Sequence, residues 1–170
     1  MLEYSVANVK LSLKTSKIFL DNVCAIAEEK KLYCKNYKNF IVLKCDFTYI
    51  IFKSKAEQSE SHINITKIPN IKNILEAIDI IKSLIDCTII SYNIDNIIAT
   101  TSLKKRINLA SISKSGKFDN LKYNNEKFPG IFLKFNIGTV ILFHSGKLVI
   151  VGCKNLNSVE CLIQKISVLI

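Results

Sequence analysis

Matching residues recur at a nearly constant offset along this chain of 170 residues. At an offset of 88 the matching pairs are Asn8 with Asn96, Asn36 with Asn124 and Phe40 with Phe128. The segments Ile81–Ile85 and Ile166–Ile170 end the two halves alike, at an offset of 85. Because this period is longer than that of solenoid repeats, the chain is predicted to be a duplicated unit, residues 1–85 and 86–170, and not a repeat array.

Both halves show the same order of patterns. Alternation over residues 4–13 and 92–101 predicts a first strand, and apolar spacing over 18–29 and 103–112 predicts a short helix. Further strands are predicted at 131–135, 139–143 and 148–151, with a tight turn at His144–Lys147. An amphipathic helix closes each half, at 71–85 and 158–169, and Ile74, Ile78, Ile81 and Ile85 form one apolar stripe. Helices on one face of an antiparallel sheet define an α+β fold, in which the two halves pair edge to edge and leave the other face free.

Two strands of the second half are apolar at consecutive positions, Val140–Phe143 and Leu148–Val151. A sheet with one wet face should alternate apolar and polar residues, so both faces here are expected to leave water. One reading is an apolar partner surface such as the minor-groove floor of AT-rich DNA. The other is a fully buried central strand or an oligomer interface, and the periodicity does not decide between them.

The net charge of +10 favours a polyanionic partner, nucleic acid first and an acidic membrane surface second. Arg106 is the only arginine among 24 basic residues, so lysine contacts with phosphates are expected more than arginine contacts with guanine. A basic surface that is merely solvated is the alternative. No apolar run is long enough to cross a membrane.

The six cysteines contain no C-x-x-C pair, and the only histidines are His62 and His144. A structural zinc site needs about four convergent ligands, so no metal site is expected. Reduced, mostly buried thiols in an intracellular protein are expected instead. Met1–Lys14 alternates and is charged, which is not the pattern of a signal peptide.

Two runs of the second half carry a family resemblance. Phe128–Ile131 reads FPGI, and Val140–Lys154 reads VILFHSGKLVIVGCK. They resemble the second repeat of TATA-box-binding proteins, with F-P-G-L followed by L-L-I-F-x-S-G-K-[VI]-V-x-T-G-A-K. The resemblance implies a TBP-like saddle in which two pseudo-symmetric repeats form one curved antiparallel sheet with helices on the convex face.

The resemblance also implies roles for individual residues. In this family paired phenylalanines wedge between base steps at each end of the site and unstack them. The matching wedges are Phe128 with Phe143 and, in the first repeat, Phe40 with Phe52. The positions expected in the minor groove are Asn8, Asn96, Ile98, Ile141, Val149 and Val151. Those expected near phosphates are Lys134, Lys147 and Lys10.

The chain departs from the family at several of these positions. Val151 replaces a threonine, which removes one hydroxyl hydrogen bond to a base. Lys10 stands where the family has an apolar residue, so it either contacts a base edge or phosphate or blocks close approach. In the eroded first repeat the Ser-Gly-Lys turn is replaced by a longer polar segment, Lys53–His62.

The implied function is that of a general transcription initiation factor that binds and bends AT-rich promoter DNA through the minor groove. The implied partners are double-stranded AT-rich DNA, a TFIIB-type initiation factor and RNA polymerase, in the nucleus or at a viral transcription site in the host cell. The divergence suggests a large DNA virus or a parasite as the source. The alternative is a scaffold of the same fold with weak or no DNA binding.

No catalysis is expected, and neither is a cofactor, a small-molecule substrate or a membrane partner. The paired carboxylates at Glu28–Glu29 and at Glu57 and Glu60 lie in polar stretches, where solvated charge is the ordinary reading.

Overall fold

The computed structural model describes residues 2–54 and 59–170. The chain forms two compact units. Residues Asn8–Asp95 form one, here called the N-terminal unit, and Met1–Ala7 with Asn96–Ile170 form the other, the C-terminal unit. Two long strands, β1 (Ser5–Ser16) and β6 (Ile89–Ser102), run through both units. The units thus divide at 7/8 and 95/96, whereas the expected sequence repeats divide at 85/86, a boundary that stays a prediction.

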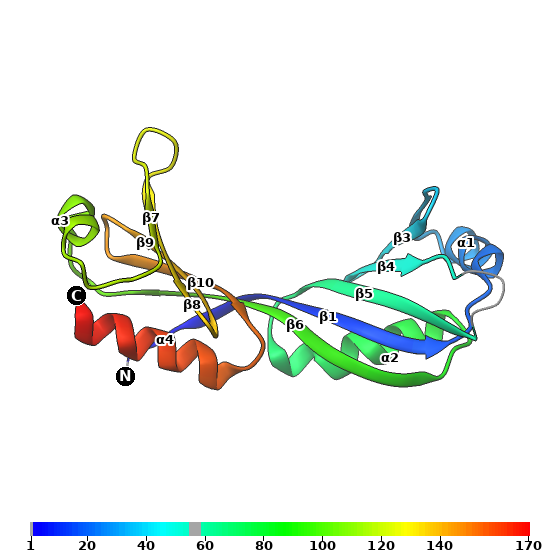
Figure 1. Ribbon diagram of the computed structural model, residues 1–170. Coiled ribbons are helices and arrows are strands. Elements are labelled where there is room, and N and C mark those ends of the chain that lie inside the picture. Colours follow the sequence, from blue (N-terminus) through cyan, green and yellow to red (C-terminus); the bar gives the residue numbers. More distant parts are fainter. Residues whose placement is uncertain (1, 55–58) are drawn as a thin grey trace. The chain divides into compact units, whose positions relative to one another are not determined.

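The N-terminal unit is an antiparallel sheet with a long helix on one face (Figure 1). Its strands lie in the order β2-β3-β4-β5-β1. After β1 its elements are α1 (Leu20–Glu29), β2 (Tyr33–Asn36), β3 (Phe40–Lys44), β4 (Thr48–Phe52), β5 (Glu60–Ile68), a 3₁₀ turn η1 (Ile71–Asn73) and α2 (Ile74–Leu84). The predicted stripe Ile74, Ile78, Ile81 and Ile85 is buried along its whole length.

The core of this unit lies between α2 and one face of the sheet. In β1, Val9, Leu11 and Leu13 are fully buried and alternate with half-buried residues, as a strand with one packed face requires. Tyr49 of β4 is also buried, and its hydroxyl donates to the carbonyl oxygen of Ala77 in α2 at 2.9 Å. Its burial raises the pKa of this phenol. One sheet face is therefore committed to the helix, and the opposite face, called the open face below, is not.

The C-terminal unit repeats this plan (Figure 1). Its strands lie in the order β6-β10-β9-β8-β7. Its elements after β6 are α3 (Leu109–Lys114), β7 (Leu121–Tyr123), β8 (Gly130–Phe135), β9 (Gly138–Phe143), β10 (Lys147–Cys153) and α4 (Leu156–Leu169). The buried side of α4 consists of Val159, Leu162, Ile163 and Ile166. Asn155 caps this helix by accepting from the backbone N–H of Ser158 at 2.8 Å, which satisfies one unpaired donor of the first turn.

The helix expected at 103–112 is wrong in its first half, since α3 begins at Leu109. The preceding residues are held by backbone hydrogen bonds to the β9–β10 turn instead. Leu103 N–H donates to Gly146 at 2.9 Å and Ile107 N–H donates to His144 at 2.8 Å. These tertiary bonds outweigh the weak local preference of a short apolar pattern.

The polar segment expected at Lys53–His62 is also shorter than predicted, because β5 already begins at Glu60. Residues 55–58, Glu57 among them, lie outside the described residues. Of the helices within the described ranges, none combines the length and the apolar character that a membrane crossing requires.

Candidate nucleic-acid interface

Phe128 and Phe143 form an aromatic pair on the open face of the C-terminal unit. Phe143 ends β9 next to the fully buried Leu142, so strand alternation places its ring on the side away from α4. The two ring centroids are 5.8 Å apart, and the ring planes are inclined by 55°. Both side chains are half-buried and stay partly accessible. The structure thus brings together the two residues that the sequence paired.

Gly130 makes room for this pair. It lies opposite Phe143 in the register of β8 and β9. A Cβ atom at position 130 would stand 2.8 Å from Cε1 of Phe128 and 3.2 Å from Cε1 of Phe143. A larger residue at position 130 therefore displaces one ring or both. This steric limit explains why the Phe-Pro-Gly run has a glycine at this position.

An apolar surface continues from the pair across the sheet. Phe132, which sequence reasoning did not single out, has its ring centroid 4.9 Å from that of Phe128. Phe132, Ile141 and Val149 are cross-strand neighbours in one row over β8, β9 and β10. All three are half-buried, and they alternate with fully buried core residues. Together with Ile98 and Val151 they form what we call the apolar floor.

Asn96 is anchored at one end of its side chain. Its Oδ1 accepts a hydrogen bond from the backbone N–H of Gly152 at 2.6 Å. Its amide nitrogen has no hydrogen-bond partner within residues 2–54 and 59–170, so a donor remains available. Asn8, its counterpart, differs: its Oδ1 is buried and finds no donor in the described part of the chain.

The two lysines predicted near phosphates in this unit are both exposed. Lys134 lies on β8 and Lys147 opens β10, opposite Ser102. Neither forms an ion pair with an acidic residue among those described. Their charges are therefore not neutralised by the chain itself.

Phe40 and Phe52 form the corresponding pair of the N-terminal unit. They are direct cross-strand partners of β3 and β4, with ring centroids 6.2 Å apart and planes inclined by 54°. Tyr37, which the sequence did not identify, stacks on Phe40 at 4.8 Å. Phe52 is exposed and Phe40 is half-buried. The predicted pairing of these rings is present, with an extra aromatic beside it.

Beyond this aromatic pair, the open face of the N-terminal unit carries the half-buried Val42 and Ile50 on β3 and β4. Over β1 and β5 it is polar. Lys10 Nζ lies 3.5 Å from a carboxylate oxygen of Asp95, and the Ser12 hydroxyl donates to the other oxygen at 2.8 Å. Asn64 faces Ser12 across β5 and β1. We call Lys10, Ser12, Asn64 and Asp95 the polar floor. Lys10, expected at a phosphate, is thus already paired with a carboxylate of its own chain.

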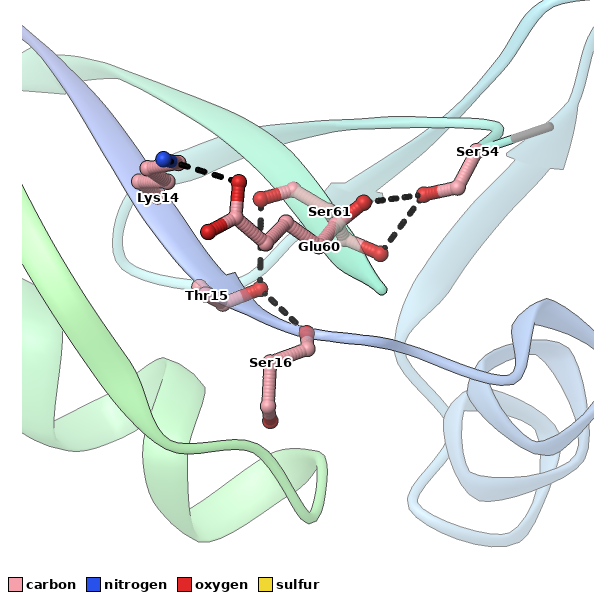
Figure 2. A network of polar contacts seen from close by, with 6 residues as sticks. All are labelled: Lys14, Thr15, Ser16, Ser54, Glu60 and Ser61. Carbon is pink, nitrogen blue, oxygen red and sulfur yellow. Dashed lines mark hydrogen bonds and ion pairs between the residues drawn. The ribbon is translucent and has the colours of Figure 1, made fainter. Parts of the chain in front are cut away.

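A second ion pair lies at the end of β1 (Figure 2). Lys14 Nζ is 2.8 Å from Glu60, and both side chains are about two-fifths exposed, at 41% and 39%. Next to it the Ser54 hydroxyl donates to the Glu60 carbonyl at 2.9 Å and lies 2.8 Å from the Ser61 hydroxyl oxygen. Glu60, expected to be a solvated carboxylate, is partly exposed and forms an ion pair with Lys14.

The expectation of mostly buried thiols is wrong. Cys153 is buried, Cys161 is exposed, and the other four cysteines are half-buried. The sulfur atoms of Cys24 in α1 and Cys34 in β2 are 3.5 Å apart. Burial first, and then the neighbouring Cys24, raise the pKa of Cys34 to about 11.

Comparison with known proteins gives consistent similarities. The family described as "Transcription factor TFIID (or TATA-binding protein, TBP)" matches residues 91–170. A TATA-box-binding protein of Picrophilus torridus is 32% identical over 112 residues, which cover 61% of this chain and 61% of that protein. One from Pyrococcus horikoshii is 33% identical over 85 residues, or 49% of this chain and 44% of that protein. The matched region thus spans less than two thirds of the length of these curated relatives.

The whole chain is similar in fold to the solved structure of Methanococcus jannaschii TBP. The TM-score is 0.78 at 24% sequence identity, and the match covers 97% of this chain and 96% of the other. The family match thus lies in the second half of the chain, at residues 91–170, whereas the fold similarity extends over both halves.

Proposed function

Since this chain belongs to the TATA-binding protein family, we propose that it is a general transcription initiation factor that binds the minor groove of AT-rich DNA and bends it. The observation that carries the proposal is the Phe128–Phe143 pair, held on an open sheet face next to an apolar floor. An exposed apolar patch of this kind marks a surface that a partner covers.

The pair is suited to act as a wedge. The two rings lie together where β8 begins and β9 ends, and such rings can enter a base step and unstack it, at a cost of a few kcal/mol per step. Gly130 leaves both rings the space to take this position. The cost is offset when the bent duplex covers more of the protein surface.

The remaining groups fit a minor groove rich in A·T pairs. That groove presents hydrogen-bond acceptors and no donors, so the free amide of Asn96 is a complementary donor. Ile98, Ile141 and Val149 cover sugar edges and base floor without demanding hydrogen bonds. Lys134 and Lys147 supply unpaired charges for phosphates, which fix position and carry no sequence information.

A bent promoter complex of this kind would recruit a TFIIB-type factor and RNA polymerase at the genome, in the nucleus or at a viral transcription site. No step of this function requires the chain to make or break a covalent bond.

Fluorescence anisotropy of a short AT-rich duplex tests the proposal. Affinity should fall steeply between about 50 and about 200 mM salt, because phosphate contacts release counterions. The double variant Lys134→Gln with Lys147→Gln should flatten the slope of log K against log salt by about two, since each phosphate contact contributes about one. Lys72→Gln, an exposed lysine of η1 that lies outside the open-face strands, is the matched control. Binding that ignores salt would contradict the proposal.

A second candidate function is favoured by the polar floor. An N-terminal unit whose Lys10 and Lys14 are already ion-paired offers little to a duplex. In that case the chain acts as a scaffold that recruits transcription proteins with weak or no DNA binding. The same anisotropy assay separates the two functions, because a scaffold binds AT-rich duplexes weakly or not at all even at low salt, where phosphate contacts are strongest.

A further inference from the structure

Asp95 places a carboxylate on a sheet face that the proposed function assigns to DNA. We propose that Asp95 is a specificity-determining residue that accepts a hydrogen bond from the 2-amino group of a guanine in the minor groove. This inference rests on the proposed DNA-binding function and adds to it one preferred base pair in the part of the site contacted by the N-terminal unit.

The position of Asp95 follows from its two partners. Lys10 and Ser12 alternate along β1 with the fully buried Val9, Leu11 and Leu13, so they point to the open face. Asp95 contacts both Lys10 and Ser12, and therefore lies on that face as well. Its side chain is 33% exposed, so it is accessible to a ligand.

The carboxylate has unused hydrogen-bonding capacity. One oxygen accepts from Ser12 at 2.8 Å, and the other lies 3.5 Å from the ammonium of Lys10. An ionised carboxylate offers about four lone-pair sites, so at least one remains for a ligand. Lys10 offsets part of the negative charge that would otherwise repel the phosphates, and Ser12 holds the group in place.

Minor-groove chemistry then selects the ligand. A·T and T·A pairs show only acceptors there, and an acceptor facing a carboxylate is repelled. A G·C pair adds the amino group at N2 of guanine, the one donor on the groove floor. Asp95 therefore has a favourable partner only where the sequence contains guanine.

The apolar floor of the C-terminal unit selects in the opposite direction. Ile98 stands at the offset of 88 from Lys10, and Val149 stands at the offset of 85 from Asn64. Neither aliphatic side chain can accept from a guanine amino group, which would be left without a partner, at a cost in binding. The preferred site is therefore asymmetric, with A·T pairs under one unit and a G·C pair under the other.

Inosine substitution tests this directly with the full chain. A single G·C pair is moved stepwise through an AT-rich duplex, and at each position guanine is also replaced by inosine, which lacks only the 2-amino group. At one position the wild-type chain should bind the inosine duplex about five-fold more weakly than the guanine duplex, since a single base contact is worth less than a bidentate one. This readout needs no variant.

Two variants assign the effect to the carboxylate. Asp95→Ala should bind the guanine and inosine duplexes equally, and Asp95→Asn should keep part of the preference because its amide oxygen still accepts. Asp79→Ala removes an exposed carboxylate from α2 and is the matched control, which should keep the full preference. Thermal melts establish that each variant is folded.

The outcomes separate the two proposals. If the chain binds AT-rich DNA but guanine and inosine are equivalent at every position, Asp95 is only a counter-ion of Lys10 and this inference is overturned, while the proposed function stands. If no duplex binds at all, the proposed function fails and takes this inference with it.

Discussion

The two open faces differ although the two cores do not. At the offset of 85, Ile63 and Ile65 of β5 correspond to Leu148 and Ile150 of β10, and all four are fully buried. At the alternate positions of the same strands, Asn64 and Thr66 correspond to Val149 and Val151. Polar residues of one unit thus stand at the positions of apolar residues in the other. Packing against a helix requires apolar residues on the inner face of each sheet. The residues of the outer face are not constrained by the core.

Charge follows the same division. In the N-terminal unit two open-face lysines are ion-paired, Lys10 with Asp95 and Lys14 with Glu60. In the C-terminal unit Lys134 and Lys147 are exposed and have no acidic partner among the described residues. We therefore propose that most of the DNA affinity comes from the C-terminal unit, and substitutions at matched positions of the two units test this.

A charge placed on each floor gives the largest expected contrast. Val149→Asp should weaken binding to an AT-rich duplex about a hundred-fold, because an unpaired carboxylate would be buried against the groove at a cost of several kcal/mol. The corresponding Asn64→Asp should cost less than about ten-fold, since the cation of Lys10 on that polar floor offsets part of the added negative charge. Anisotropy titrations measure both. Equal losses would mean that the two floors are equivalent.

Gly146→Ala tests the tight turn that belongs to the C-terminal unit. Gly146 has φ of +83°, and a Cβ there would overlap the carbonyl oxygen of Lys105. We expect the free energy of unfolding to fall by about 2–3 kcal/mol, measured by urea denaturation. Gly116→Ala is the control, because it has φ of +66° but open space around the added carbon, and should cost about 1 kcal/mol. A smaller loss at Gly146 than at Gly116 would contradict the steric account.

Gly130→Val tests the space behind the wedge rings. The valine side chain would displace Phe128, Phe143 or both, and should weaken DNA binding about ten-fold, or about 1.4 kcal/mol, as the rings lose their place. Position 130 does not need a positive φ, so the variant is expected to fold. Thermal melting checks this and separates the loss of binding from unfolding. Unchanged affinity in a folded variant would show that the ring positions do not matter.

Glu60→Gln should have the smallest effect. Exposed ion pairs contribute about 0.2–1 kcal/mol, so the free energy of unfolding should change by less than about 1 kcal/mol. The freed Lys14 should strengthen DNA binding about two-fold to three-fold at low salt and less at high salt, because the Debye length shortens. A loss of affinity would instead give Glu60 a role in binding. Glu28→Gln, an exposed carboxylate of α1, is the matched control.

The sequence predicted those features that burial makes periodic. The stripe from Ile74 to Ile85 follows from helical spacing, because one face of the helix must leave water. The strands around Ile141 and Val149 were predicted from two runs of consecutive apolar residues on either side of a turn. The pairing of Phe128 with Phe143 was expected from the resemblance, and the register of β8 and β9 brings the rings together.

Contacts between distant residues were not predictable in this way. Lys10 and Asp95 are 85 residues apart, and nothing local links them until β1 and β6 are placed. The start of α3 at Leu109 depends on bonds from Leu103 and Ile107 to a turn some 40 residues later along the chain. Phe132 could have been predicted from the sequence. It lies between Ile131 and Leu133 in a predicted strand, so if those two face the core, Phe132 faces the opposite side.

The bend of an AT-rich duplex, measured by energy transfer between dyes at its two ends, tests the central claim most directly. The wild-type chain should shorten the distance between the ends. Phe128→Ala with Phe143→Ala should abolish the bend in a folded protein, whereas Phe40→Ala with Phe52→Ala should reduce it only in part. A bend that survives the loss of Phe128 and Phe143 would contradict the account.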